Sequence, residues 1–182
     1  MATSDIIFKQ GKFMKNNSEK ASFGRYGKTF QEGLVQLIYD DRPFADQITE
    51  VLNINFLELE YLRVFVNKIV DYRTKYNIHP STEAITTILN TDLERDSDVI
   101  QRQVRDYFRK IQYRELADID YIKEQSLDFC RKQNLKEAMM KSVALLQTCS
   151  FDEISKTIND ALKLGSDNNF GYDYLTDFEE RF

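Results

Sequence analysis

Glycine and proline are scarce in this chain, with six and two residues among 182. Sustained alternation of polar and apolar residues, the pattern of a half-buried strand, is also missing. Apolar residues instead recur at spacings of three and four along most of the sequence, as in amphipathic helices. These features exclude a sheet protein and predict an all-α fold.

Long apolar runs and cysteine pairs are lacking as well. No apolar stretch approaches the roughly 20 residues of a membrane span, and Lys9 interrupts Ile6-Ile7-Phe8 before a signal peptide can form. If Cys130 and Cys149 share one straight helix, they lie on the order of 28 Å apart, too far for a disulfide. We therefore expect a cytoplasmic protein that makes no membrane contact.

Residues for catalysis or metal binding are missing too. His79 is the only histidine, and it stands before Pro80 in a turn without partners spaced as metal ligands. The segment Gly24–Thr29 resembles a phosphate-binding loop, but Ser22 occupies the position of its first glycine and no strand precedes it. No nucleophile lies near a base. The chain is predicted to hold no catalytic, cofactor or metal site.

Charge is unevenly distributed along the chain. The net charge is −5; residues 1–28 carry six Lys or Arg against two Asp or Glu, so their balance is +4 and the remainder carries −9. A basic segment attracts nucleic acid electrostatically. Its low apolar content favours a solvated, flexible leader instead. Contact with DNA through this chain is therefore expected to be weak or indirect.

Residues 29–114 read as a compact head of five helices joined by short turns. Thr29 with Glu32 matches a capping box at the start of the first helix, and Asn55 with Glu58 matches another before the third. The apolar stripes of these helices suffice to close one core.

Residues 115–165 read as a helical hairpin. A long helix spans about 118–149, Ser150 marks the turn, and a second helix follows. Ser126 and Gln133 interrupt the apolar stripe of the long helix, so its middle is predicted to be exposed or slightly bent. The apolar excess on this pair predicts cover by another chain. Folding of the hairpin onto residues 29–114 explains it equally well.

Residues 166–182 read as a polar, flexible link and a short aromatic helix. Leu175, Phe178 and Phe182 follow one another at helical spacing. A short helix of this kind is typical of a peptide that docks in a groove of another domain or subunit. The alternative is a C-terminal helix that closes the same domain.

The tail also carries a family resemblance. Gly171-x-Asp173-Tyr174-Leu175-x-Asp177-Phe178-Glu179-x-Arg181-Phe182 resembles the linker helix of phage replicative DNA helicases of the T-even type, which are relatives of the bacterial DnaB family. The turn His79-Pro80-Ser81 and the order of head, hairpin and linker helix are similar as well. The resemblance covers about residues 29–182.

This resemblance implies the N-terminal domain and linker of a hexameric helicase. In the family, hairpins pair between neighbouring subunits to form a collar, the linker helix docks on the adjacent subunit, and primase and the helicase loader bind nearby. The implied partners are therefore further copies of the chain, from a dimer to a hexameric ring, a primase and a loader. The implied hairpin interface comprises Phe129, Leu135, Met139, Met140, Val143, Leu146, Phe151, Ile154, Ile158 and Leu162. The implied docking face of the linker helix comprises Tyr174, Leu175, Phe178 and Phe182.

The chain departs from the family in lacking the ATPase half. ATP and Mg²⁺ are expected for that half, and no cofactor is expected for this chain. We therefore expect either a piece of a longer helicase or a stand-alone relative. The alternative function is a helical adaptor or helicase regulator without enzymatic activity.

Overall fold

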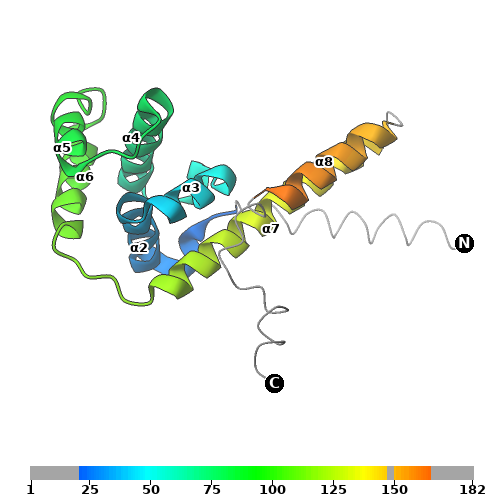
Figure 1. Cartoon of the computed structure of the whole chain (residues 1–182), viewed down its shortest axis with the longest axis horizontal. Helices are drawn as coiled ribbons and strands as arrows, with labels where there is room; N and C mark the ends of the chain where they lie inside the picture. Colours follow the sequence, from blue (N-terminus) through cyan, green and yellow to red (C-terminus); the bar gives the residue numbers. More distant parts are fainter. Residues whose placement is uncertain (1–20, 147–149, 165–182) are drawn as a thin grey trace, which may run out of the picture.

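A computed structural model describes residues 21–146 and 150–164. These ranges contain seven α-helices, two short 3₁₀ helices and no strand, which confirms the predicted all-α fold (Figure 1). The elements in chain order are η1 (Phe23–Tyr26), α2 (Gly27–Asp40), α3 (Arg42–Val51), η2 (Ile54–Phe56), α4 (Glu60–Tyr76), α5 (Thr82–Thr91), α6 (Asp98–Ile111), α7 (Ile119–Leu146) and α8 (Phe151–Lys163).

Helix α2 is the centre of the head. Every residue from Phe30 to Ile38 is buried, because η1, α3, α4 and α7 all pack against this helix. Its apolar side chains join a core that continues into α4 and α6. Three polar side chains on α2, Gln31, Glu32 and Gln36, are buried as well and therefore need partners inside the head.

The head begins earlier in the chain than residue 29. Phe23 is fully buried, and its ring lies 6.0 Å from the ring of Phe30 and 6.1 Å from that of Tyr26. The Ser22 hydroxyl accepts a hydrogen bond from the Gly24 amide and caps η1. Residues 21–28 therefore belong to the folded head, while residues 1–20 lie outside the described part of the chain.

The two capping boxes predicted for the head are wrong. Helix α2 begins at Gly27, before Thr29, and the Glu32 side chain is buried among distant partners. Helix α4 begins at Glu60, and Asn55 lies in η2 instead. The carboxylate of Glu58 accepts a hydrogen bond of 3.0 Å from the Ser22 hydroxyl. In both places, tertiary partners outweigh the local capping pattern.

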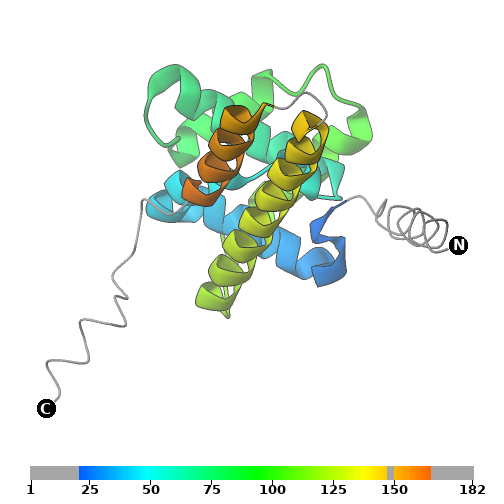
Figure 2. The ribbon, with the colours of Figure 1, turned by 90° about the vertical axis from the view of Figure 1, so that its right-hand side faces the viewer.

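Helices α7 and α8 form an arm beside the head. The first half of α7 packs on α2 and α3, and its second half runs away from the head (Figure 1). Helix α8 returns along this second half, and the two helices lie side by side in both views (Figure 2). We call the second half of α7 together with α8 the hairpin.

The prediction of an exposed or bent stretch around Ser126 is wrong at that residue. Ser126 is fully buried, and its hydroxyl donates a hydrogen bond to the Ile122 carbonyl within the same helix. A small side chain whose polar group is satisfied locally allows α7 to lie close to the head. Gln133, further along α7, is half-buried.

Among the described residues, no helix has both the length and the apolar character required to cross a bilayer.

Candidate functional site

The first half of α7 is anchored in the head by Phe129. This ring is buried, and its centroid lies 4.4 Å from that of Phe23 and 5.4 Å from that of Phe56. The guanidinium of Arg25 covers the same ring at 5.3 Å. Phe129, which the resemblance assigns to the hairpin interface, therefore lies in an aromatic cluster of the head in this structure.

Two polar contacts fix α7 to α3. Lys123 Nζ lies 2.5 Å from Asp41 Oδ2, and Asn134 Nδ2 donates to the Val51 carbonyl at 3.0 Å. Burial alone would raise the pKa of Asp41, but the hydrogen bonds from Lys123 and the Phe44 amide, with the Lys123 charge, outweigh it and lower that pKa. The contacts bracket Phe129 and hold both ends of the anchored half of α7.

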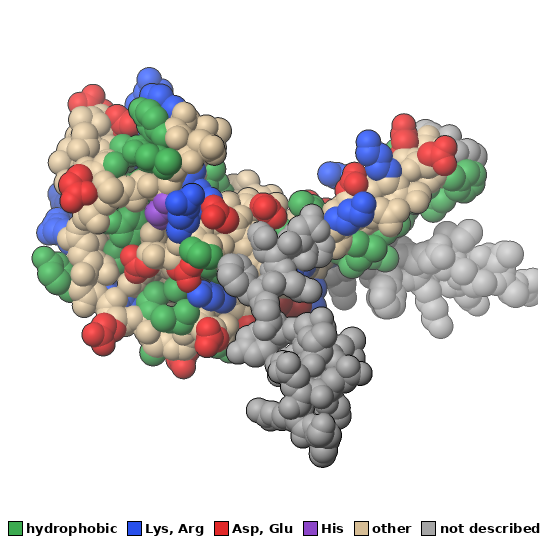
Figure 3. All heavy atoms as spheres, viewed as in Figure 1, with side chains coloured by type: hydrophobic (Ala, Val, Ile, Leu, Met, Phe, Trp, Pro, Cys, Tyr) green, Lys and Arg blue, Asp and Glu red, His purple; other side chains and the backbone are tan. Residues whose placement is uncertain are grey.

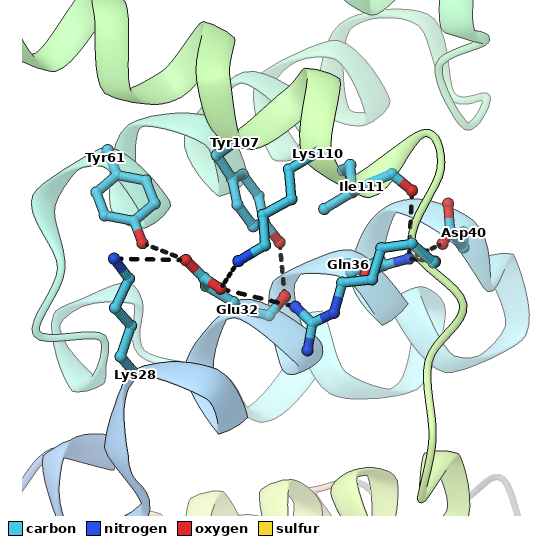
Figure 4. Close-up of polar contacts among 9 residues, drawn as sticks. Lys28, Glu32, Gln36, Asp40, Tyr61, Tyr107, Lys110 and Ile111 are labelled. Carbon is cyan, nitrogen blue, oxygen red and sulfur yellow. Dashed lines mark hydrogen bonds and ion pairs between the residues drawn. The ribbon is translucent and has the colours of Figure 1, made fainter.

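The connection between head and hairpin is held by a buried carboxylate, Glu32 (Figure 4). Tyr61 and Lys110 donate hydrogen bonds to it at 2.9 and 2.6 Å. Lys28 and Arg114 add ion pairs at 3.8 and 3.7 Å. Burial favours the neutral acid, but these hydrogen bonds and charges outweigh it and lower the pKa of Glu32. One carboxylate thus joins α2, α4 and α6 to the segment that leads into α7.

Gln36 lies one turn further along α2, and its side chain binds backbone carbonyls at the end of α6 and in the segment between α6 and α7. Its Nε2 lies 3.4 Å from the Ile111 carbonyl, 2.8 Å from the Arg114 carbonyl and 3.1 Å from Asp40 Oδ2 (Figure 4). We call Glu32, Gln36 and their partners the polar anchor. Together with the Phe129 cluster it sets the direction in which the hairpin leaves the head.

A seam of small residues joins the two helices of the hairpin. Ala138 and Ser142 of α7 and Ala161 of α8 are buried, and the Ser142 hydroxyl donates to the Ala138 carbonyl at 2.8 Å. Small side chains at such contacts let two helices approach closely. The i, i+4 spacing of Ala138 and Ser142 is the sequence signal for this seam, and the spacing of the large apolar residues does not indicate it.

Large apolar residues lie beside the seam on one side of the hairpin. Met139, Val143 and Leu162 each follow a seam residue directly, so each lies about 100° around its helix from the seam. Because the two right-handed helices are antiparallel, this same rotation brings both sets to the same side of the hairpin. We define the hairpin face as Met139, Met140, Val143, Leu146, Phe151 and Leu162, with Met140 at its edge.

The hairpin face is exposed. Each of its side chains exposes more than half of its surface, from 53% for Leu146 to 68% for Phe151. The residues that directly precede the seam, Glu137, Lys141 and Asp160, are charged and exposed. They therefore lie on the opposite side. Figure 3 shows hydrophobic side chains along one edge of the hairpin and charged ones along the other.

The ten residues assigned to hairpin packing thus occupy three environments. Six form the exposed hairpin face, and Phe129 lies in the head. Leu135, Ile154 and Ile158 are half-buried. The assigned docking residues Tyr174, Leu175, Phe178 and Phe182 lie outside the described residues.

The described residues contain no group of three or more His, Cys, Asp or Glu arranged to hold a metal ion. Cys130 is buried, which raises the pKa of its thiol to about 12. It therefore stays protonated and is a poor nucleophile. The candidate site of this part of the chain is a surface for association, the hairpin face. No protein-family model, curated protein or solved structure matches the chain.

Proposed function

We propose that this chain is the N-terminal assembly domain of a hexameric replicative DNA helicase, and that the hairpin face pairs with the same face of a second copy. The hairpin face is the observation that supports this proposal best. It is a continuous apolar strip on an arm that leaves the head, and both of its helices contribute. Exposed apolar patches of this kind are typical of interaction sites.

A second copy suits this face because two identical apolar strips are self-complementary about a two-fold axis. Burial of a half-exposed Met, Val, Leu or Phe side chain contributes about 1 kcal/mol, so six residues from each copy contribute about 12 kcal/mol. Association itself costs roughly 4–15 kcal/mol. With a cost of about 7 kcal/mol, within that range, the net gain of about 5 kcal/mol corresponds to a Kd of about 0.2 mM. Pairing of the isolated chain should therefore be weak and concentration-dependent.

Other parts of the chain would serve the assembled helicase. The heads form a collar that engages primase and the loader, and Tyr174, Leu175, Phe178 and Phe182 dock on the ATPase domain of a neighbouring subunit. ATP and Mg²⁺ bind that ATPase domain. The family resemblance of the tail carries these further assignments.

Sedimentation velocity at protein concentrations from about 10 µM to about 1 mM tests the pairing, because this range spans the expected Kd. Val143→Asp and Phe151→Asp place a charge in the apolar contact, and should weaken dimerisation more than tenfold. Asp at position 151 lies in the first turn of α8, where the helix dipole favours it, so the fold should persist. The matched control is Lys141→Asp, because Lys141 is exposed and lies on the opposite, charged side of the hairpin. If all three variants associate like the wild type, or if the wild type stays monomeric at 1 mM, pairing through this face is refuted.

Membership of the helicase family needs a separate test. The proposal requires that the gene continue past the codon for Phe182 into a segment with a Gly-x-x-x-x-Gly-Lys-Ser/Thr loop. Reading the gene downstream decides this. A stop codon there would leave the helical adaptor without enzymatic activity, whatever the oligomeric state.

A further inference from the structure

A cleft of about 330 Å³ lies on the head between α3 and the end of α4. Two arginines, Arg42 from the first turn of α3 and Arg73 from the last turn of α4, line it together with His79. No hairpin residue lines the cleft, so it is independent of the proposed pairing.

Arg73 is held rigidly in this cleft. Its Nη2 is paired with Asp46, and its Nη1 lies 3.4 Å from His79 Nδ1. His79 Nε2 lies 2.7 Å from the Tyr39 carbonyl, which only accepts, so Nε2 carries the proton and Nδ1 accepts from Arg73. A guanidinium fixed on two sides in this way is preorganised to present its remaining N–H groups.

Polar side chains without a partner among the described residues lie next to Arg73. Arg42 is exposed, and within the described part of the chain its side chain makes no hydrogen bond or ion pair. The side chains of Thr74 and Asn77, which also line the cleft, likewise have no partner among the described residues. The cleft therefore offers one free guanidinium, one fixed guanidinium and two neutral polar groups to a ligand.

The surroundings limit which anion fits. Asp46 on α3, which is paired with the cleft residue Arg73, carries negative charge beside the cleft, which disfavours a polyanion such as DNA. Val70 and the 54% exposed Ile78 provide apolar surface beside the arginines. A single carboxylate on an otherwise apolar segment matches this combination, and Arg forks bind carboxylates in two-point geometry.

We propose that this cleft is a docking site for an acidic side chain, Asp or Glu, in an apolar segment of a partner protein. Arg42 supplies the free charge, and Arg73 the fixed one. The carboxylate of the ligand completes the hydrogen bonding of both guanidinium groups, while Val70 and Ile78 contact its apolar neighbours.

An NMR titration of the full chain tests the proposal. The probes are the capped peptide acetyl-Leu-Glu-Leu-amide and its Gln counterpart, inorganic phosphate and a 15-nucleotide single-stranded DNA. We expect saturable shifts at the amides of Thr74, Asn77 and Ile78 with the Glu peptide. The Gln peptide should bind at least about tenfold more weakly. Arg42→Gln should abolish these shifts. The control Arg102→Gln, which removes an exposed arginine on α6, should leave them unchanged.

Three results would overturn the proposal. Equal shifts with the Glu and Gln peptides would show that the carboxylate is not recognised. Tighter binding of phosphate or of DNA would assign the cleft to a phosphate ligand. Absence of saturable shifts up to about 20 mM peptide, well above a millimolar Kd, would show that the cleft is no binding site. Because Arg42 is exposed, its replacement should not unfold the head, and the dispersion of the remaining amide signals checks this.

Discussion

Replacement of Glu32 by Gln removes one negative charge from the polar anchor while it preserves the size of the side chain. An amide oxygen can still accept from Tyr61 or Lys110, but the ion pairs with Lys28, Lys110 and Arg114 are lost. The perturbation is therefore electrostatic and creates no cavity. It also adds two amide donors to a site where every neighbour is already a donor.

The expected loss of folding free energy depends on how well water can solvate each cation once the carboxylate is gone. Removal of one partner of a fully buried ion pair costs roughly 3–5 kcal/mol. The Lys28 and Lys110 side chains are 65% and 52% exposed, so solvent screens their share strongly. Arg114 is only 22% exposed and retains an uncompensated charge. We expect a loss of about 2 kcal/mol. For a protein of this size, that loss lowers Tm by roughly 4–8 °C.

Thermal unfolding followed by circular dichroism at several pH values tests this reasoning. The folded-state pKa of Glu32 is lowered from 4.5, because hydrogen bonds and nearby cations outweigh the opposing effect of burial. A lowered pKa stabilises the fold fully above the unfolded value, and this stabilisation is lost as the pH falls through the folded value. The Tm difference between wild type and Glu32→Gln should therefore be largest above about pH 5.5 and shrink below pH 4.5.

The matched control is Glu137→Gln, since the Glu137 side chain is exposed and makes no hydrogen bond or ion pair with the described residues. It should melt within about 1 °C of the wild type. If Glu32→Gln melts like this control at neutral pH, the Glu32 carboxylate does not stabilise the head. A Tm difference that stays constant down to pH 3 would equally contradict the assigned charge.

Three further substitutions test the anchoring of α7. Gly33→Ala should raise the free energy of unfolding, measured with urea, more in an Ile122→Val background than in the wild type. A Cβ at Gly33 would lie 2.9 Å from Ile122 Cδ1, the atom that Ile122→Val removes. Phe129→Ala should cost about 3–5 kcal/mol in the same assay, since the ring is buried in an aromatic cluster. Asp41→Asn retains a good N-cap but loses the Lys123 ion pair, and should cost about 1 kcal/mol at pH 7 and progressively less as the pH falls below 4.

The helices of this fold could be predicted because their signals are local. The apolar spacing of α4, α6 and α8 indicates their cores. Ser97 stands at the start of α6, where its hydroxyl accepts a hydrogen bond from the Ile100 amide and caps the helix. Glu32 could not be predicted in the same way. Its four partners lie up to 82 residues away, so only the tertiary structure reveals why it leaves the local capping pattern.

The hairpin face shows the same division between local and tertiary information. Periodicity identifies which residues of α7 and α8 are apolar, and six of the ten residues assigned by resemblance do form one surface. Periodicity cannot tell which of them face the partner helix, because Ala138, Ser142 and Ala161 occupy that position. Once these small residues fill the seam, Val143 and Leu162 must turn outward together. The identity of the smallest residues therefore determines which large ones stay available for association.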